Sequence, residues 1–154
     1  MGRIFSAVFT GVAVTAQQDL LSILAPATEA IHIHGLILSQ TTEIGDAMEE
    51  QLSIQVTSGA TSAGSVGTSP TAIPDFLGST AFGGTVRAND TTRASAGTIV
   101  THHSDTWNVR TQFLWMPPPE LRWRIAPSAR LVVGLLTTPA DSITMNGTIY
   151  FESV

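Results

Sequence analysis

Apolar and polar residues alternate along several stretches of the chain. The clearest stretch runs from Trp107 to Trp115, where every second side chain suits a buried face. The same period of two recurs over 121–125 and 142–152. Because successive side chains of a β-strand point to opposite faces of the sheet, this period predicts strands with one buried and one solvated face.

The same pattern extends over most of the chain, and the expected strands cover residues 3–9, 12–16, 30–40, 52–57, 85–88, 98–102, 105–116, 121–125, 129–136 and 142–152. Segment 30–40 becomes apolar on both faces, which indicates a strand that is central or covered by a neighbouring subunit. Segment 17–24 differs, because its leucines have helical spacing and Pro26 lies just beyond them. It predicts one or two helical turns across an end of the molecule.

Short strands separated by glycine and proline favour a sandwich or a barrel. We expect an all-β, single-domain β-sandwich over residues 1–154, jelly-roll-like, with about eight to ten antiparallel strands and one short helix. The proline run 117–119 should end a strand, and Asn146-Gly147 should add a kink or bulge to the last one. A long loop rich in Gly, Ser, Thr and Pro, at about 58–84, is expected to be mobile or ordered by a partner.

Composition narrows the functional classes. Only 12% of the residues are charged, against about a quarter in ordinary soluble domains, and the formal net charge is -5. A nucleic-acid partner is therefore not expected. All 7 basic residues are arginine, which suits protein interfaces but also follows from a GC-rich genome. There is no cysteine, which excludes disulfides and thiolate chemistry.

The sequence predicts neither a signal peptide nor a membrane helix. Residues 1–10 have the pattern of a first strand and lack the long apolar run of a signal peptide. No stretch approaches the roughly 20 apolar residues of a membrane helix. We expect a soluble product that is not exported by the general secretion route and has no membrane partner.

Two histidine groups are the weak candidates for a metal site. His32 and His34 share one face of a strand, and His102 is the candidate third ligand, but the motif of a β-barrel metal site is not evident. An acidic group at 43–50 lacks the ligand spacing of a calcium loop. No metal and no cofactor are therefore expected.

Catalytic residues are not expected either. Ser104 and Asp105 follow His102 and His103, which supplies the residue types of a nucleophilic triad. Neighbours along a strand cannot converge on one point, and the chain has neither a G-x-S-x-G elbow nor a phosphate-binding glycine loop. We expect a protein that is not an enzyme.

Aromatic and arginine side chains are the better candidates, because both are enriched at protein interfaces. Trp107 and Phe113 are expected in the core. Whether the group around Trp123 belongs to the core and its wet face or to an interface stays open. The candidate interface residues are Phe76, Phe82, Arg122, Trp123 and Arg124.

Four segments carry a family resemblance. "HIHGLILSQ", "EIGDAMEEQLSIQV", "VTHHSDTWNVRTQFLWMPPPELRWRIAPSARLVVGLL" and "PADSITMNGTIYFESV" resemble small structural proteins encoded among the head genes of tailed bacteriophages. The resemblance implies a virion component of jelly-roll type, a capsid decoration (cement) protein made in the host cytoplasm and placed on the capsid surface. It implies the major capsid protein and copies of itself as partners, commonly as a homotrimer, and no active-site residues.

Three functional hypotheses follow. The favoured one is a non-enzymatic decoration protein that stabilises the head shell as a homo-oligomer, with the long loop and the N-terminal segment as contact elements. The second is a receptor- or glycan-binding module of a collar, spike or tail fibre, in which Trp123 or Trp115 stacks on sugar. The third is a cupin-like metalloprotein that uses His32 and His34.

Overall fold

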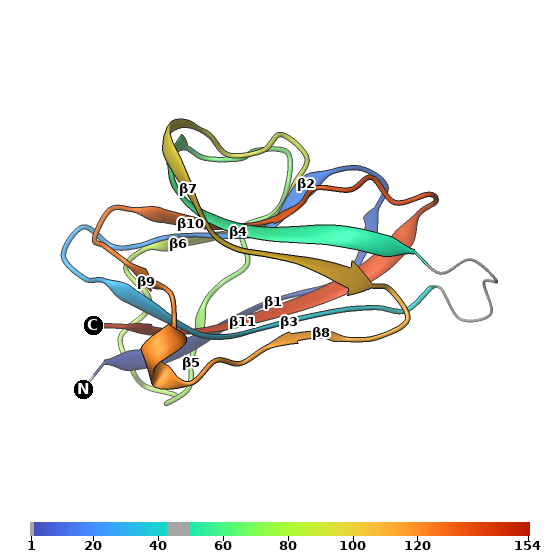
Figure 1. The fold of residues 1–154 in the computed structure, drawn as a ribbon. Coiled ribbons are helices and arrows are strands. Elements are labelled where there is room, and N and C mark those ends of the chain that lie inside the picture. Colours follow the sequence, from blue (N-terminus) through green and yellow to red (C-terminus); the bar gives the residue numbers. More distant parts are fainter. Residues whose placement is uncertain (1, 43–49) are drawn as a thin grey trace.

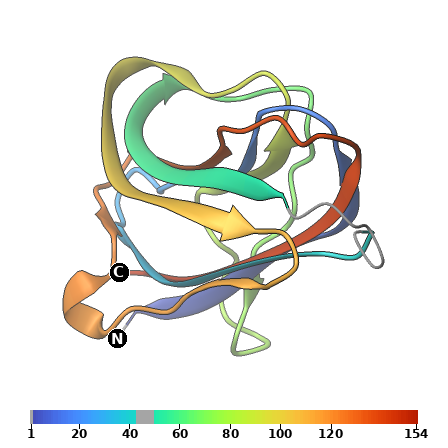
Figure 2. The same cartoon turned by 45° about the vertical axis from the view of Figure 1, so that its right-hand side comes forward.

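The computed structural model describes residues 2–42 and 50–154 (Figure 1). Two antiparallel sheets lie face to face and enclose one apolar core, as Figures 1 and 2 show from two directions. The predicted all-β sandwich is confirmed. Within the described residues, no helix is long and apolar enough to cross a membrane.

The first sheet, called the β1 sheet here, contains both ends of the chain. Its strand order is β5-β1-β11-β3-β8, and β9 pairs with β3 beside β8. The strands are β1 (Arg3–Val14), β3 (Ile31–Gln40), β5 (Ile73–Pro74), β8 (Phe113–Trp115), β9 (Arg124–Ile125) and β11 (Ile143–Ser153).

The second sheet, called the β2 sheet, has the order β6-β2-β10-β4-β7. Its strands are β2 (Gln18–Leu24), β4 (Gln51–Ser62), β6 (Thr85–Asp90), β7 (Ser95–Asn108) and β10 (Arg130–Leu135).

The path of the chain is that of a jelly roll. Strands β1, β2, β3 and β4 alternate between the two sheets, β4 pairs with β7, and β8, β10 and β11 alternate again. The first and last strands, β1 and β11, therefore lie side by side in one sheet. Two interleaved sheets with this order are the architecture predicted from the strand pattern.

The core is built from the inward rows of both sheets. In the β1 sheet the rows are Phe5–Phe151–Ile33, Ala7–Ile149–Leu36 and Phe9–Gly147–Leu38–Phe113, and in the β2 sheet one row is Ala88–Leu21–Val133–Val56. Apart from the glycine, these side chains all belong to one buried apolar cluster. Burying a large apolar side chain contributes about 1.5–3 kcal/mol, so this cluster supplies the main driving force for folding.

The helix expected at 17–24 is wrong, because the segment forms the buried strand β2. A register shift opposite β10 leaves Leu20 as an extra residue between Asp19 and Leu21. Leu20 and Leu21 are both fully buried as a result. This bulge breaks the period of two and produces the leucine spacing that resembles a helix.

The single strand expected at 105–116 is also wrong. Strand β7 ends at Asn108 in one sheet, and β8 begins at Phe113 in the other. Between them the indole Nε1 of Trp107 donates a hydrogen bond to the carbonyl oxygen of Thr111 over 2.5 Å. Alternation continues through the turn because Trp107 and Phe113 enter the same core from opposite sheets.

Other boundaries shift for local reasons. The expected strands 3–9 and 12–16 form one strand, β1, with a register shift at Gly11, where φ is 65°. The bulge expected at Asn146 therefore lies on the opposite strand, and the Oδ1 of Asn146 accepts a hydrogen bond from the Gly11 N–H. Strand 121–125 shrinks to β9. The one helix among the described residues is the 3₁₀ turn η1 (Pro119–Leu121), which follows the proline run.

The loop expected at 58–84 is largely ordered by the sandwich itself. Strand β4 runs on to Ser62, and the excursion 63–94 then adds β5 to the edge of β1 and β6 to the edge of β2. Bridges Ser65–Thr92 and Thr68–Ala88 tie its two limbs together. The excursion therefore covers one edge of each sheet, edges that would otherwise present unpaired backbone groups.

Candidate interaction surface

The outward face of the β1 sheet is assembled from alternate residues of its strands. Strand pairing aligns two outward rows across it: Ile4–Glu152–His32–Arg124 and Val8–Thr148–Ile37–Leu114. Residues that pair directly in an antiparallel sheet point to the same side, so each row is a continuous strip of side chains.

Several large apolar side chains on this face are solvent-exposed among polar ones. The exposed fractions are 42% for Ile4, 47% for Val8, 58% for Leu114 and 37% for Tyr150. A face of this kind, with large apolar side chains on neighbouring strands, marks an interaction site more often than isolated exposed residues do. We call it the β1 face.

The β1 face continues at both edges. Met116, which is 61% exposed, lies over the outward side of Gly35, because a Cβ built on Gly35 would meet its Cγ at 3.3 Å. On the opposite edge, Ile73 of β5 is 50% exposed. Asp75, directly after β5, donates its N–H to the carbonyl oxygen of Ile4 over 2.9 Å.

The chain just beyond Asp75 carries the most exposed aromatic residue. Phe76 is 77% exposed and its neighbour Leu77 is 82% exposed. The Ser79 N–H donates to the Phe76 carbonyl oxygen, and Gly78 has a φ of 107°, so a tight turn holds the pair outward. We call Phe76 and Leu77 the apolar tip.

Charged and titratable side chains gather in one row of the β1 face, where Glu152, His32 and Arg124 follow Ile4. The imidazole Nε2 of His34 lies 3.2 Å from the Oε2 of Glu152. At the same end of the sheet, on the side of the buried Phe5, the Nη2 of Arg3 donates to both carboxylate oxygens of Glu29 over 2.7 Å, and the Ser153 hydroxyl also donates to Glu29. The Ser153 hydrogen bond and the pair with Arg3 lower the pKa of Glu29 from its ordinary 4.5.

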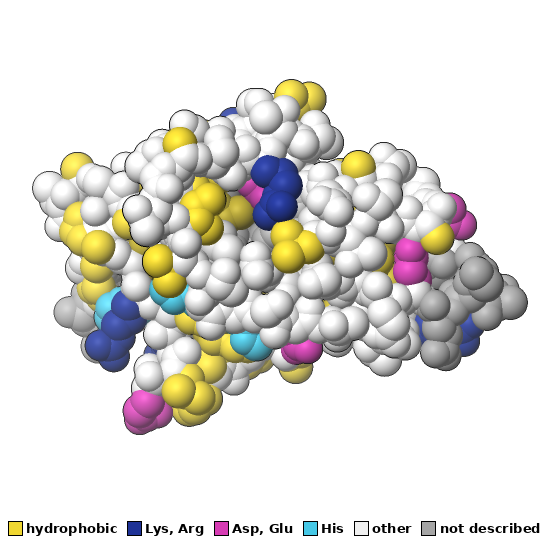
Figure 3. All heavy atoms as spheres, turned by 45° about the horizontal axis from the view of Figure 1, so that its top comes forward, with side chains coloured by type: hydrophobic (Ala, Val, Ile, Leu, Met, Phe, Trp, Pro, Cys, Tyr) yellow, Lys and Arg dark blue, Asp and Glu magenta, His cyan; other side chains and the backbone are white. Residues whose placement is uncertain are grey.

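The surface elsewhere is poor in charge. Figure 3 shows a face on which neutral polar atoms predominate and charged side chains are scattered. The chain's 12% charged residues are too few to build a strong field. A surface with so few charges offers shape and apolar area more than electrostatic steering.

The metal candidates do not converge. His32 and His34 lie on the β1 face, whereas His102 lies on β7 of the other sheet, with its Nε2 2.7 Å from the Ser58 hydroxyl. No group of three or more metal-ligating side chains occurs in the described part of the chain. Of the acidic group at 43–50, only Glu50 lies within the described residues.

The other interface candidates occupy three different settings. Phe82 packs against the core, with ring centroids 5.4 Å from Phe5 and 4.9 Å from Phe151. Arg124 lies at the end of an outward row and is exposed, and Arg122 is half-buried. With the exposed Phe76, these positions show that the five candidates do not form one patch.

Trp123 is buried at the open edge of the sandwich. It is 8% exposed, and its ring stacks on Trp115 with centroids 3.5 Å apart. His103 closes the edge, 5.7 Å from the Trp123 centroid. The ring face that a sugar would need is occupied by another side chain, so the geometry gives the glycan-binding hypothesis no platform at Trp123.

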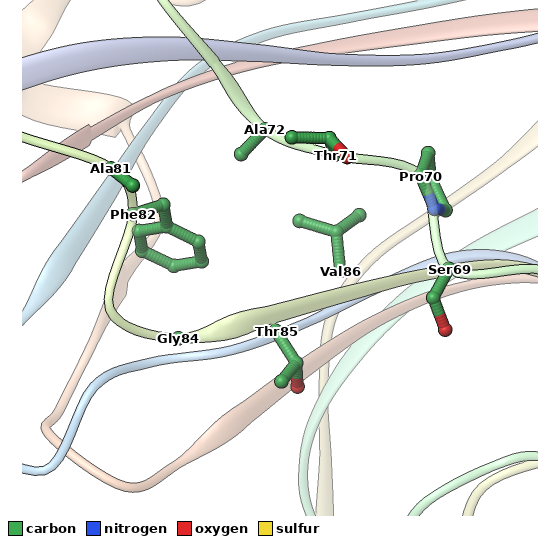
Figure 4. Close-up of a pocket in the computed structure, with 9 residues that line it drawn as sticks. All are labelled: Ser69, Pro70, Thr71, Ala72, Ala81, Phe82, Gly84, Thr85 and Val86. Atoms are coloured by element: carbon green, nitrogen blue, oxygen red, sulfur yellow. The ribbon is translucent and has the colours of Figure 1, made fainter.

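A small pocket lies inside the excursion. It measures about 250 Å³ and is framed by one limb at 69–72 and the returning limb at 81–86 (Figure 4). Phe82, Ala72 and Val86 point toward one another across it (Figure 4). Its walls carry no charged or catalytic side chain among the residues that line it.

The sequence pattern missed the β1 face, although a signal for it exists. Around residues 4–9 both parities are apolar, because Ile4 and Val8 alternate with Phe5, Ala7 and Phe9. One parity fills the core and the other is left outside. Apolar residues on both faces of an edge-proximal strand are the feature that could have located this surface.

Comparisons with known proteins identify no family for the chain. No protein-family profile and no curated protein match the chain. One solved structure similar to it is described as "Crystal structure of the T13 IBDV viral particle reveals a missing link in icosahedral viruses evolution", with 14% identity and a TM-score of 0.16. The similarity covers 99% of this chain and 39% of that one, and a TM-score this low carries no argument about function.

Proposed function

We propose that the chain is a non-enzymatic virion structural protein, a capsid decoration (cement) protein that binds the major capsid protein of a tailed bacteriophage as a homo-oligomer. The observation that carries the proposal is the β1 face, where Ile4 and Val8 of β1, Tyr150 of β11 and Leu114 of β8 are exposed on the same side of one sheet. The jelly-roll topology and the family resemblance of the sequence support the same class.

Burial of the β1 face would bridge and stabilise neighbouring capsid subunits. A standard interface buries about 800 Å² per partner. The chain exposes 7557 Å² in all, so such an interface needs only about a tenth of its surface. Each contact can be weak, because many copies and linked subunits add avidity.

The apolar tip is the second contact element. Phe76 and Leu77 are exposed just beyond β5 at the edge of the β1 sheet, whereas the β1 face lies on the sheet itself. Two distinct surfaces suit the two partners expected, one for the shell and one for a further copy of the chain. We assign the β1 face to the shell and the apolar tip to contacts within a homotrimer.

Matched valine variants test the assignment to the shell. Val8→Asp places a charge on the β1 face, and Val100→Asp places the same charge on β7 of the other sheet, at 47% and 50% exposure respectively. Head shells of the encoding phage, assembled without this protein, are mixed with each variant and sedimented. We expect Val8→Asp to lose binding and Val100→Asp to retain it.

Three results would overturn the proposal. The first is an unmodified protein that fails to bind shells, and the second is equal binding of both variants. The third is binding to host surface polysaccharide in place of shells, which would support the receptor-binding alternative. Circular dichroism of both variants verifies that each remains folded.

A further inference from the structure

The outward face of the β2 sheet differs from the β1 face, because it carries charged side chains that are buried. Asp19 and Asp90 pair directly across β2 and β6, and both are 1% exposed. Arg130, at the start of β10, is 6% exposed. Arginines 87 and 93 complete the cluster.

Both carboxylates in this cluster already have cationic partners. Asp90 accepts hydrogen bonds from the Nε and Nη2 of Arg87, over 2.8 and 2.5 Å. Asp19 accepts one from the Nε of Arg93 over 2.9 Å and another from the Ala94 N–H. Each acid is therefore matched to one arginine, and the third arginine remains.

Arg130 has no acid of its own among the residues that the structure describes. Its Nε and Nη1 are enclosed and lack a hydrogen-bond partner, which leaves Nη2 to meet a ligand. Burial lowers the pKa of Arg130, and repulsion from Arg87 lowers it further, while Asp90 and Asp19 oppose both. A guanidinium nevertheless keeps its charge at neutral pH, so the cluster of three arginines and two aspartates carries one excess positive charge.

A hollow of about 430 Å³ lies beside this charge, and Arg130 forms part of its wall. The hollow lies between residues 59–61 of β4 and the turn 127–129 before β10. Its remaining wall is small, apolar or hydroxyl-bearing and includes Leu24, Gly59, Ala60, Thr61 and Ser128. The space suits a short organic group, and the two hydroxyl groups can donate hydrogen bonds to an oxygen ligand.

We propose that this hollow binds a carboxylate that carries a short apolar chain, with Arg130 as its counter-ion. One unmatched cation balances a monoanion, whereas a phosphate or sulfate dianion would leave a buried negative charge. The Nη2 of the guanidinium can donate charge-assisted hydrogen bonds to a carboxylate, and the apolar wall accommodates the attached carbon chain. The carboxylate could be that of a small organic acid or of an acidic side chain on a neighbouring protein, and the site stands independently of the proposed capsid role.

Propionate is the probe for this site. The protein is titrated with sodium propionate at constant ionic strength, with chloride as the balancing anion, and binding is followed by backbone amide shifts in NMR spectra. We expect saturable shifts at Gly59, Thr61 and Ser128. Sulfate at the same ionic strength should bind at least tenfold more weakly.

Two variants identify the side chain responsible. Arg130→Met removes the charge and retains the bulk, and Thr61→Phe fills the hollow from an exposed position and leaves residue 130 as arginine. Both should weaken propionate binding by tenfold or more. Thr61→Phe keeps the test valid if the Arg130→Met variant does not fold.

The proposal is overturned by an absence of saturable binding or by propionate affinity that persists in the folded variants. The source of the natural carboxylate is tested with N-acetyl-glutamate amide against propionate. Tighter binding of the glutamate compound indicates an acidic side chain of a partner, and tighter binding of propionate indicates a free organic acid. Failure of capsid binding by the protein would not alter these results, because they need no shell.

Discussion

Trp115 and Trp123 stack with ring centroids 3.5 Å apart and ring planes 5° apart, and together they close the edge of the sandwich between β7 and β8. His103 of β7 lies against both rings, 6.4 Å from the centroid of Trp115 and 5.7 Å from that of Trp123. Strands β7 and β8 belong to different sheets and are not paired, so contacts among these three side chains hold the two sheets together at this edge.

Trp115→Ala should therefore destabilise the fold. The half-buried ring loses apolar burial and its stacking, and we expect the free energy of unfolding to fall by about 2–3 kcal/mol. Urea denaturation measures this loss, and the emission of Trp123 should move to longer wavelength as its ring meets water. Leu121→Ala is the control, because Leu121 is 67% exposed. Equal stability of the two variants would contradict the role given to the stacked pair.

Gly147→Ala should destabilise the centre of the β1 sheet. A Cβ at Gly147 would lie 2.2 Å from the Cε1 of Phe9, whose side chain is itself buried. Overpacking of this kind costs about 1–3 kcal/mol. Adding Phe9→Leu should recover more than half of the loss in a double-mutant cycle, because leucine lacks the ring atoms that clash.

Gly83→Ala provides the control for that cycle. Its Cβ would approach no atom closer than 3.7 Å, on Pro26, so denaturation should show little change. If Gly147→Ala is as harmless as Gly83→Ala, the β1 sheet has more freedom to adjust than its packing indicates.

The architecture was predictable where alternation and burial coincide, as in the outer strands of the chain. The period of two located β3, β4 and β11, and it located β1 as two shorter strands. Alternation could not locate the turn at 109–112, because Trp107 and Phe113 are buried on either side of it in the same core. It also failed at Leu20, since the bulge there depends on pairing with a distant strand, and the leucine spacing that results resembles that of a helix.

The candidate surface was less predictable than the fold. Trp123 and Phe82 are residue types that are enriched at interfaces, yet the nearby Trp115 covers the first and Phe5 of β1 covers the second. Phe76 has the same chemistry as Phe82 and remains outside. Tertiary contacts decide which aromatic side chain stays exposed, and a single sequence does not show those contacts directly.

Glu29 should make stability depend on pH in the acidic range. The hydrogen bond from Ser153 and the pair with Arg3 lower its pKa below the ordinary 4.5. A carboxylate with a lowered folded-state pKa contributes stability above its unfolded pKa, and that contribution is lost as the pH falls through the folded pKa. Glu29→Gln should therefore lower the Tm at pH 7 and have a diminishing effect below about pH 4.

Thermal melts between pH 3 and pH 7 measure this dependence. Glu120→Gln, at an exposed position on η1, is the control and should lower the Tm at no pH in this range. A Glu29→Gln penalty of the same size at pH 3 and pH 7 would show that the effect comes from lost packing and not from the charge.

Substitutions at Phe82 should affect folding, whereas substitutions at Phe76 should affect assembly. Phe82 contacts Phe5 and Phe151, so Phe82→Ala should cost about 2–3 kcal/mol and expose the excursion 63–94 to proteases. Phe76 is 77% exposed, so Phe76→Ser, combined with Leu77→Ser, should change the free energy of unfolding by less than about 0.5 kcal/mol. The same double variant should lower the molar mass measured by light scattering after size-exclusion chromatography, because the apolar tip is the contact that we assign to the homotrimer. An unmodified protein that is monomeric at high concentration, or a double variant with unchanged molar mass, would remove the apolar tip from that role.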